Sequence, residues 1–70
     1  MRLTSDLVRV FGPSDRDTVE VVTEQLQQLG VAAVTLPSDQ TIGRWQTEVP
    51  TGDVSTARAI LLRQRVSTAR

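Results

Sequence analysis

The sequence contains no cysteine, histidine, lysine or tyrosine. Without cysteine the chain cannot form a disulfide, and without cysteine and histidine it lacks the ligands of the common zinc sites. These absences also remove most of the side chains that serve as general bases, nucleophiles or Schiff-base formers. No glycine pattern matches a phosphate-binding or dinucleotide-binding loop. We therefore expect a protein that is not an enzyme, with no catalytic residue, no metal and no cofactor.

Aromatic residues and net charge are also scarce. The only aromatics are Phe11 and Trp45, and eight arginines balance eight acidic residues. Sheet proteins that bind RNA need aromatics on an open, basic face, so nucleic acid is not an expected partner. The charge is unevenly distributed, because residues 1–53 hold four arginines and all eight acids, whereas residues 54–70 hold four arginines and no acid. That C-terminal segment is either a docking face for an acidic protein or a helix end whose arginines complement the helix dipole.

Long apolar runs are missing as well. The N-terminal segment has no signal-peptide core, and no stretch approaches the roughly 18 apolar residues of a membrane span. We expect a cytoplasmic protein with no membrane partner. The 70 residues make a single small domain (1–70) with an ordered core at about residues 7–64. Because domains of this size bury only about 60% of their unfolded surface and often gain stability by oligomerising, we expect a homodimer.

Alternating apolar residues predict three strands, over residues 7–11, 31–36 and 44–49. In the first, Val8 and Val10 are expected to face the core, which leaves Leu7, Arg9 and Phe11 on the opposite face. In the third, Trp45 is expected to point inward and to anchor the core. The residues between the second and third strands, 37–43, have the composition of a loop.

Two helices complete the pattern. Val19, Val22, Leu26 and Leu29 form an apolar stripe with helical spacing, which predicts a helix that begins after Ser14 as N-cap and ends at Gly30. A second, basic helix is predicted after the Pro-Thr-Gly turn, with its apolar side formed by residues between Val54 and Leu62.

The resulting order, β-α-β-β-α, is typical of an α+β, ferredoxin-like half-sandwich: a three-stranded sheet with both helices on one face. The right-handed crossover rule makes the strands at 7–11 and 31–36 parallel, with 44–49 between them and antiparallel to both. No fourth strand follows, so the first strand is expected at an open edge of the sheet.

Two sets of candidate binding residues follow from this arrangement. A protein partner is expected on the open sheet face or on the basic helix, and the candidate contact residues are Leu7, Arg9, Phe11, Arg44, Arg58, Arg63 and Arg65. Gly12, Ser14 and Asp15 lie at the start of the first helix, where backbone N–H groups can bind an anion. The same three residues also suit a simple turn and helix cap.

Three stretches resemble a family of short bacterial proteins described as putative signal-transducing proteins with a PII-like (GlnB-like) ferredoxin fold. These stretches are LVRVF at 7–11, LQQLGVAAV at 26–34 and EVPTGDVSTARAILL at 48–62. The resemblance implies a small regulatory or adaptor domain and carries over no catalytic residue. The loop at 37–43 is too short to reproduce the long effector-binding loop of PII proteins. Two further families with this topology, peptidoglycan-binding cell-division repeats and amino-acid-binding regulatory domains, are similar over parts of the chain.

The sequence therefore favours a non-enzymatic regulatory or protein-interaction module that docks through its open sheet face or its basic C-terminal helix. One alternative is a small-molecule sensor that holds its ligand at a subunit interface near Gly12–Asp15. Another is a phage or plasmid protein that inhibits a host factor.

Overall fold

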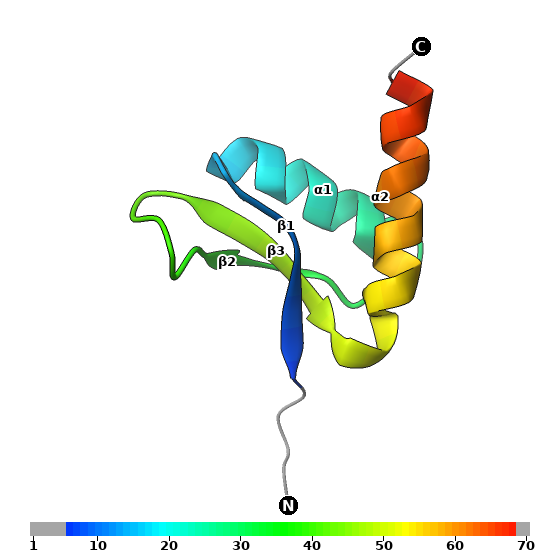
Figure 1. Cartoon of the computed structure of the whole chain (residues 1–70), viewed down its shortest axis with the longest axis horizontal. Helices are drawn as coiled ribbons and strands as arrows, with labels where there is room; N and C mark the ends of the chain where they lie inside the picture. The colour runs from blue at the N-terminus through cyan, green and yellow to red at the C-terminus, as the bar shows by residue number, and fades with distance from the viewer. Residues whose placement is uncertain (1–5, 69–70) are drawn as a thin grey trace, which may run out of the picture.

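The computed structural model describes residues 6–68, with side chains described over residues 6–64. Over this range the chain forms a small α+β domain with an open three-stranded sheet and two helices (Figure 1). In chain order the elements are β1 (Leu7–Ser14), α1 (Arg16–Gln28), β2 (Val34–Pro37), β3 (Trp45–Pro50), the 3-10 turn η1 (Thr51–Asp53) and α2 (Val54–Thr68).

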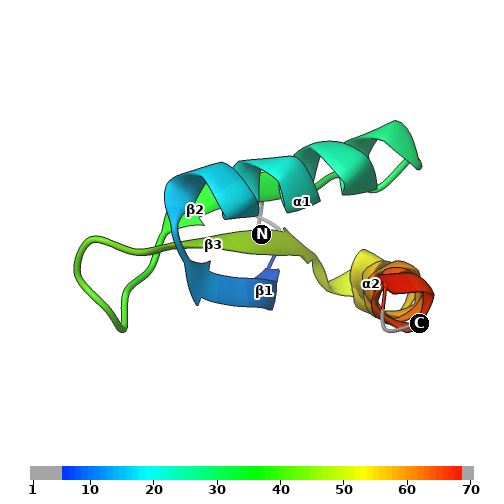
Figure 2. The same ribbon diagram turned by 90° about the horizontal axis from the view of Figure 1, so that it is seen from above.

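The central strand of the sheet is β3, which pairs with β1 on one side and β2 on the other and is antiparallel to both. The predicted strand order is thus confirmed, with β1 at an edge. The helix α1 lies across one face of the sheet, and within residues 6–68 no helix covers the opposite face (Figure 2). We call this opposite side the open face.

The placement of α2 differs from the prediction that both helices lie on one face. This helix stands upright at the end of the sheet in Figure 1, and Figure 2 shows it end-on beside the sheet instead of alongside α1. Its direction is set by η1, where Thr51 donates both its backbone N–H and its hydroxyl to the carbonyl of Asp6. Among the described side chains of α2, only Ala57 is fully buried. Val54, Ile60 and Leu61 are half-buried and pack against the core, whereas Arg58, Leu62 and Arg63 are exposed.

Two strand boundaries also differ from the prediction. β1 does not end at Phe11 but continues through Pro13 to Ser14, which pairs with Trp45. Proline is tolerated there because β1 is an edge strand, where a missing N–H costs no ladder hydrogen bond. β2 is shorter than predicted and occupies residues 34–37, because the preceding Val31 and Ala33 leave the sheet to enter the core.

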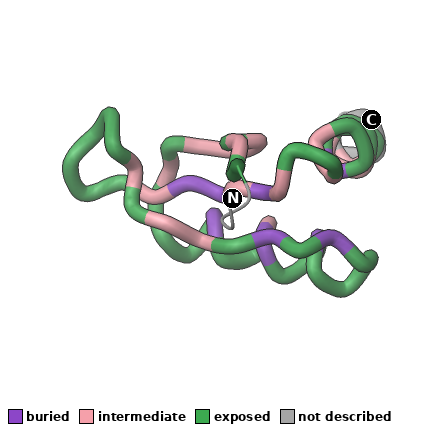
Figure 3. The backbone as a smooth tube through the Cα atoms, turned by 90° about the horizontal axis from the view of Figure 1, so that it is seen from below, coloured by how far each residue is buried: buried purple, intermediate pink, exposed green. Residues whose placement is uncertain are grey.

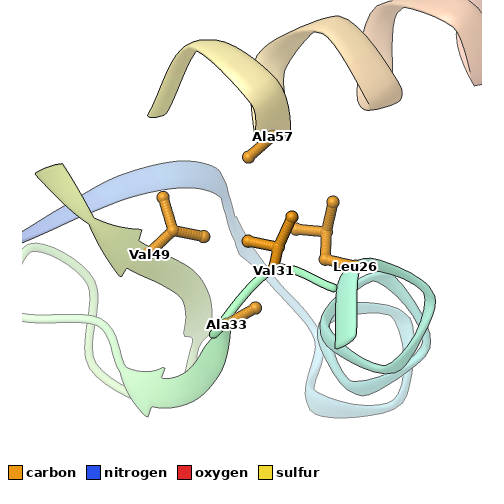
Figure 4. Close-up of a cluster of buried hydrophobic side chains, with 5 residues drawn as sticks. All are labelled: Leu26, Val31, Ala33, Val49 and Ala57. Carbon is orange, nitrogen blue, oxygen red and sulfur yellow. The ribbon is translucent and has the colours of Figure 1, made fainter. Parts of the chain in front are cut away.

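The hydrophobic core is small and lies where α1, the α1–β2 connection, β3 and α2 meet. Figure 3 shows the buried segments along the side of α1 that faces the sheet and along β3. The central cluster consists of Leu26, Val31, Ala33, Val49 and Ala57 (Figure 4). Four of these five residues are valines or alanines, and all four lie outside α1, so the core contains few large side chains.

Trp45 is not part of this core, and the prediction that it anchors the core is wrong. It is the first residue of β3 and is only half-buried. Its ring is covered by the guanidinium of Arg16, whose Cζ lies 4.7 Å from the ring centroid. A positive charge at the first position of a helix is disfavoured by the helix dipole, and this cation–π contact offsets part of that cost.

Three threonine hydroxyls connect α1 to the sheet beside the apolar core. Thr35 of β2 donates to Thr23 of α1 (2.8 Å), and the hydroxyls of Thr23 and Thr47 lie 2.9 Å apart. Thr47 of β3 in turn donates to the carbonyl of Val19 (3.4 Å). Since each hydroxyl has one proton to donate, Thr23 must donate to Thr47, and the bonds form a directed chain from β2 through α1 to β3. We call these residues the threonine relay.

A β-bulge changes the direction of the side chains along β1. Arg9 lies opposite Glu48, but Phe11 lies opposite Thr47, so Val10 is an extra residue on this strand. Residues directly opposite each other point to the same side of the sheet. Phe11 therefore lies on the side of Thr47 and α1, and the prediction that it shares the open face with Arg9 is wrong.

Directly after the bulge, β1 approaches β3 closely at Gly12. This glycine has φ +103°, and a Cβ atom added to it would lie 2.8 Å from the carbonyl oxygen of Trp45 and 3.0 Å from the Cα of Gln46. Both the backbone conformation and the lack of space require glycine here. Gly12 is thus accounted for by strand packing.

We predict that Thr47→Val lowers the free energy of unfolding by about 1–3 kcal/mol, because it keeps the shape but leaves the buried Thr23 hydroxyl without its acceptor. The double substitution Thr23→Val, Thr47→Val removes both buried hydroxyls and should cost less than the sum of the two single changes. Urea denaturation of the four proteins measures this difference. Additive effects would contradict the relay.

We predict that Gly12→Ala is more destabilising than Gly43→Ala. Gly43 also has positive φ (83°), but nothing lies within 4 Å of a Cβ at that position. Gly43→Ala should therefore lower the free energy of unfolding only through the unfavourable positive φ, by about 1–2 kcal/mol. Gly12→Ala should lower it further, because its Cβ atom also clashes with β3. Thermal or urea denaturation of both variants gives the comparison, and equal losses would show that β1 can move away from β3.

Candidate functional site

The predicted ligand turn at Gly12, Ser14 and Asp15 forms the N-terminal cap of α1. The cap residue is Asp15, so the prediction that Ser14 is the N-cap is wrong. The Asp15 carboxylate accepts hydrogen bonds from the backbone N–H of Thr18 (3.0 Å) and from the Thr18 hydroxyl (2.8 Å). Ser14 donates its own hydroxyl to the same carboxylate (3.3 Å). The bonds from Thr18, the backbone N–H first, lower the pKa of Asp15. A carboxylate therefore already occupies the place where an anionic ligand would bind.

The predicted partner-binding residues do not form one surface. Leu7 and Arg9 lie on the open face, whereas Phe11 and Arg58 lie together where β1 meets α2. Arg63 lies farther along α2, near the end of α1. The structure thus separates the open sheet face and the basic helix into different candidate sites.

Two of the predicted partner-binding residues lie on neither the open face nor the described surface of α2. Arg44 is exposed at the end of the 38–44 loop, where its backbone carbonyl accepts from the N–H of Ser38 (2.8 Å) and its own N–H donates to Thr41. Arg65 lies in α2 but outside the residues whose side chains the structure describes.

The first surface is an apolar groove between β1 and α2, with a volume of about 410 Å³. We call it the α2 groove, and its lining residues are Val10, Phe11, Arg58, Leu61 and Leu62. Leu62 is 60% exposed, and it adds apolar surface beside the half-buried Phe11 and Leu61. Arg58 is exposed and provides the only charge among the lining residues. Such a groove suits an apolar side chain from a partner with a neighbouring acidic group.

A second pocket of about 370 Å³ lies on the other side of α2, between this helix and the C-terminal end of α1. Its lining residues are Leu29, Ile60, Arg63 and Gln64. Leu29 is 59% exposed, since the predicted apolar stripe of α1 extends one turn beyond the part that the core covers. Helix α2 is thus flanked by apolar surface on both sides, with an exposed arginine beside each pocket.

The third surface lies on the open face and is polar. This open-face pocket has a volume of about 260 Å³ and is lined by Leu7, Arg9, Asp39, Gln40, Gln46 and Glu48. Sequence reasoning predicts an inward Trp45, and regular alternation then places Gln46 and Glu48 on the opposite face, but it assigns them no role. It also missed Gln40, because nothing in a loop sequence shows that its side chain reaches back to accept a hydrogen bond from Arg9 (3.0 Å).

Between residues 6 and 68, no group of three or more acidic, histidine or cysteine residues lies close enough to hold a metal ion. Over the same part of the chain, neither helix is long and apolar enough to cross a membrane.

Comparisons of the chain with protein-family models, with curated proteins and with solved structures gave no match. The resemblance to the PII-like signal-transducing family stays a prediction from the sequence.

Proposed function

We propose that this chain is a small, non-enzymatic protein-interaction module that binds an acidic, amphipathic segment of another protein in the α2 groove. The observation that carries the proposal is the position of α2, which stands at the end of the sheet away from α1 (Figure 1). This helix has exposed apolar and basic side chains close together, namely Leu62, Arg58 and Arg63. The element order and the β1-β3-β2 sheet support a ferredoxin-like half-sandwich in which α2 has moved away from α1.

The charge distribution favours an acidic partner. From residue 54 onward the sequence has four arginines and no acidic residue. In the described part of the chain, no ion pair involves Arg58 or Arg63, and both are exposed. An acidic partner would neutralise these charges, and complementary charge raises both the association rate and the specificity of such a complex.

A second copy of the chain is the competing occupant. Pairing α2 with its own copy would bring arginine against arginine with no acid in this helix to balance them, which disfavours that arrangement. A second copy could instead offer the acidic outer side of α1, where Glu20 and Glu24 are exposed. The predicted homodimer would then use the same groove, so the experiment must separate the two occupants.

The apolar side chains that line the α2 groove argue against nucleic acid as the partner that binds there. Leu61, Leu62 and Phe11 line the groove beside Arg58. Phosphate-binding surfaces are polar and positively charged, and apolar side chains make no favourable contact with a sugar–phosphate backbone. A partner with both apolar and acidic side chains fits this lining better.

We predict that the protein binds a labelled amphipathic peptide with a leucine stripe and glutamates elsewhere, and that it does not bind the same peptide with lysine in place of glutamate. Arg58→Glu should weaken binding about tenfold or more, because it places like charges together. Leu62→Ser should weaken it without unfolding the protein, since Leu62 is mostly exposed. Fluorescence anisotropy at two salt concentrations measures these affinities.

The matched control is Arg44→Glu, which makes the same charge change on an exposed loop outside the groove and should leave peptide affinity unchanged. An equal loss of peptide affinity in Arg44→Glu and Arg58→Glu would mean that only net charge matters and would contradict a defined groove.

Sedimentation equilibrium must accompany the binding assay, because it shows whether a second copy occupies the groove. A stable dimer that the peptide cannot displace would assign the groove to a second copy, and binding of a DNA duplex in place of the peptide would assign it to nucleic acid. Either result would overturn the proposal.

A further inference from the structure

The outer edge of β1 is a row of backbone groups that no strand covers within residues 6–68. β1 lies at one edge of the sheet and pairs with β3 on one side only. Figure 2 shows β1 on the outer side of β3, with α2 beside it. An open strand edge presents unpaired N–H and C=O groups and can accept a further strand.

One hydrogen bond fixes how β1 and β3 are joined. The N–H of Thr51 donates to the carbonyl of Asp6 (3.0 Å), one position beyond the register pair of Leu7 and Pro50. Hydrogen-bonded and non-hydrogen-bonded pairs alternate along an antiparallel ladder. The pair of Leu7 and Pro50 is therefore not hydrogen-bonded, in agreement with the absence of an N–H on proline.

The same alternation locates the free backbone groups of β1. Val8 forms a hydrogen-bonded pair with Val49 of β3, and the next pair, of Arg9 with Glu48, is not hydrogen-bonded. In a non-hydrogen-bonded pair, the N–H and C=O groups point to the outer side of each strand. Leu7 and Arg9 thus direct these groups away from β3, and both residues are exposed.

The free edge is short and lies beside the α2 groove. Register shifts follow Arg9 and Phe11 along β1, and Pro13 has no N–H to offer. An added strand would therefore pair near residues 7–9. Val10 and Phe11, the next residues of β1, line the α2 groove. The free edge and the groove are thus neighbouring parts of one surface.

We propose that the acidic partner segment binds as an extended strand, which pairs with Leu7 and Arg9 and places apolar side chains at the α2 groove. This inference rests on the proposed function and adds the conformation and residue pattern of the partner. Successive side chains of a strand point to opposite sides. Those on one side of the added strand face the groove, next to Phe11, Arg58 and Leu62, and the others lie on the open face, next to Arg9. The partner is therefore a segment in which apolar and acidic residues alternate.

The charges on both sides of the edge favour acidic residues in the added strand. Arg58 is exposed beside the groove, Arg9 is exposed on the open face, and within the described residues neither forms an ion pair. An acidic residue directly opposite Arg9 would form a cross-strand pair of opposite charges, which is stabilising. Glu48 lies on the other side of Arg9, so the guanidinium separates it from the added acid.

A second copy of the chain is the competing strand at this edge. Pairing two β1 edges would bring Leu7 and Arg9 of one copy against the same residues of the other. Residues 7–11 contain no acidic residue that could balance Arg9. An acidic segment supplies the missing charge, and complementary charge favours it over a second copy.

Two peptides of equal length and composition test the conformation of the partner. In one peptide leucine and glutamate alternate, and in the other they have the spacing of a helix stripe. We expect the full chain to bind the alternating peptide about tenfold more tightly in fluorescence anisotropy. Equal or tighter binding of the helical peptide would overturn this inference and leave the proposed function standing, whereas no binding of either peptide would overturn both.

N-methylated forms of the alternating peptide test the backbone hydrogen bonds. Methylation of every second residue removes the N–H groups from one edge of the added strand. We expect methylation of one alternating set of residues to abolish binding and methylation of the other set to leave it nearly unchanged, because only one edge faces β1. Equal effects of the two sets would show that the peptide does not bind as a strand and would overturn the inference.

The matched variants Leu7→Pro and Leu7→Ala test the edge on the protein. Both lose the leucine side chain, but only Leu7→Pro loses an outward N–H, and it removes no bond to β3. Leu7→Pro should therefore bind the alternating peptide about threefold to tenfold more weakly than Leu7→Ala, with similar stability to urea. Equal affinities of the two variants would contradict pairing at this edge.

Hydrogen exchange followed by NMR gives a second measurement on the unaltered chain. The alternating peptide should protect the amides of Leu7 and Arg9 and change little at Val8, which is already bonded to β3. Unchanged exchange of Leu7 and Arg9 with the peptide bound would place the peptide elsewhere. Protection of both amides without peptide, in a stable dimer, would assign the edge to a second copy. Either result would overturn the inference.

Discussion

The structure depends on the attachment of α1 to β3, which combines the threonine relay with apolar contact. The core cluster contains only five fully buried apolar residues, of which two are alanines. Thr47 is as completely buried as Val49 and lies on the same side of β3. A buried hydroxyl is tolerated only when it is hydrogen-bonded, so the three threonines have to keep α1, β2 and β3 in one register. In a domain this small, such a directed set of bonds fixes the geometry that a thin apolar core would leave loosely specified.

The bulge in β1 determines which surfaces the domain offers. With regular alternation, Leu7, Arg9 and Phe11 would share the open face. The extra residue at Val10 turns Phe11 toward α2 and leaves Arg9 opposite Glu48. The shift between Arg9 and Phe11, the first of two register shifts in β1, thus separates an apolar groove from a polar pocket along the same strand. Gly12 permits this course, because the strand returns to β3 at a distance that no side chain would allow.

Much of the fold could be predicted from the sequence, because the signals were periodic or local. The stripe that ends at Leu29 located α1, Gly30 ended it with φ of 92°, and the β-α-β order placed β3 in the centre of the sheet. The errors arose where tertiary contacts decide. No local pattern shows a bulge, so Phe11 was assigned to the wrong face. Trp45 fits the alternating pattern of β3, but it is the first residue of this strand and lies outside the core cluster. The sites depend on long-range contacts, such as that between Arg9 and Gln40, and could not be derived from spacing.

The central claim is that α1 and the sheet form the stable unit, whereas α2 is a weakly attached helix whose exposed surface is available to a partner. Hydrogen exchange of the backbone amides in the native state tests this claim most directly. The account predicts that amides in α2 after Ala57 exchange through local opening, at a lower free energy than amides of α1 and β3, and become protected when the acidic peptide is bound. Equal protection of α2, α1 and β3 in the free protein would show that α2 unfolds only with the whole domain, and would contradict the account.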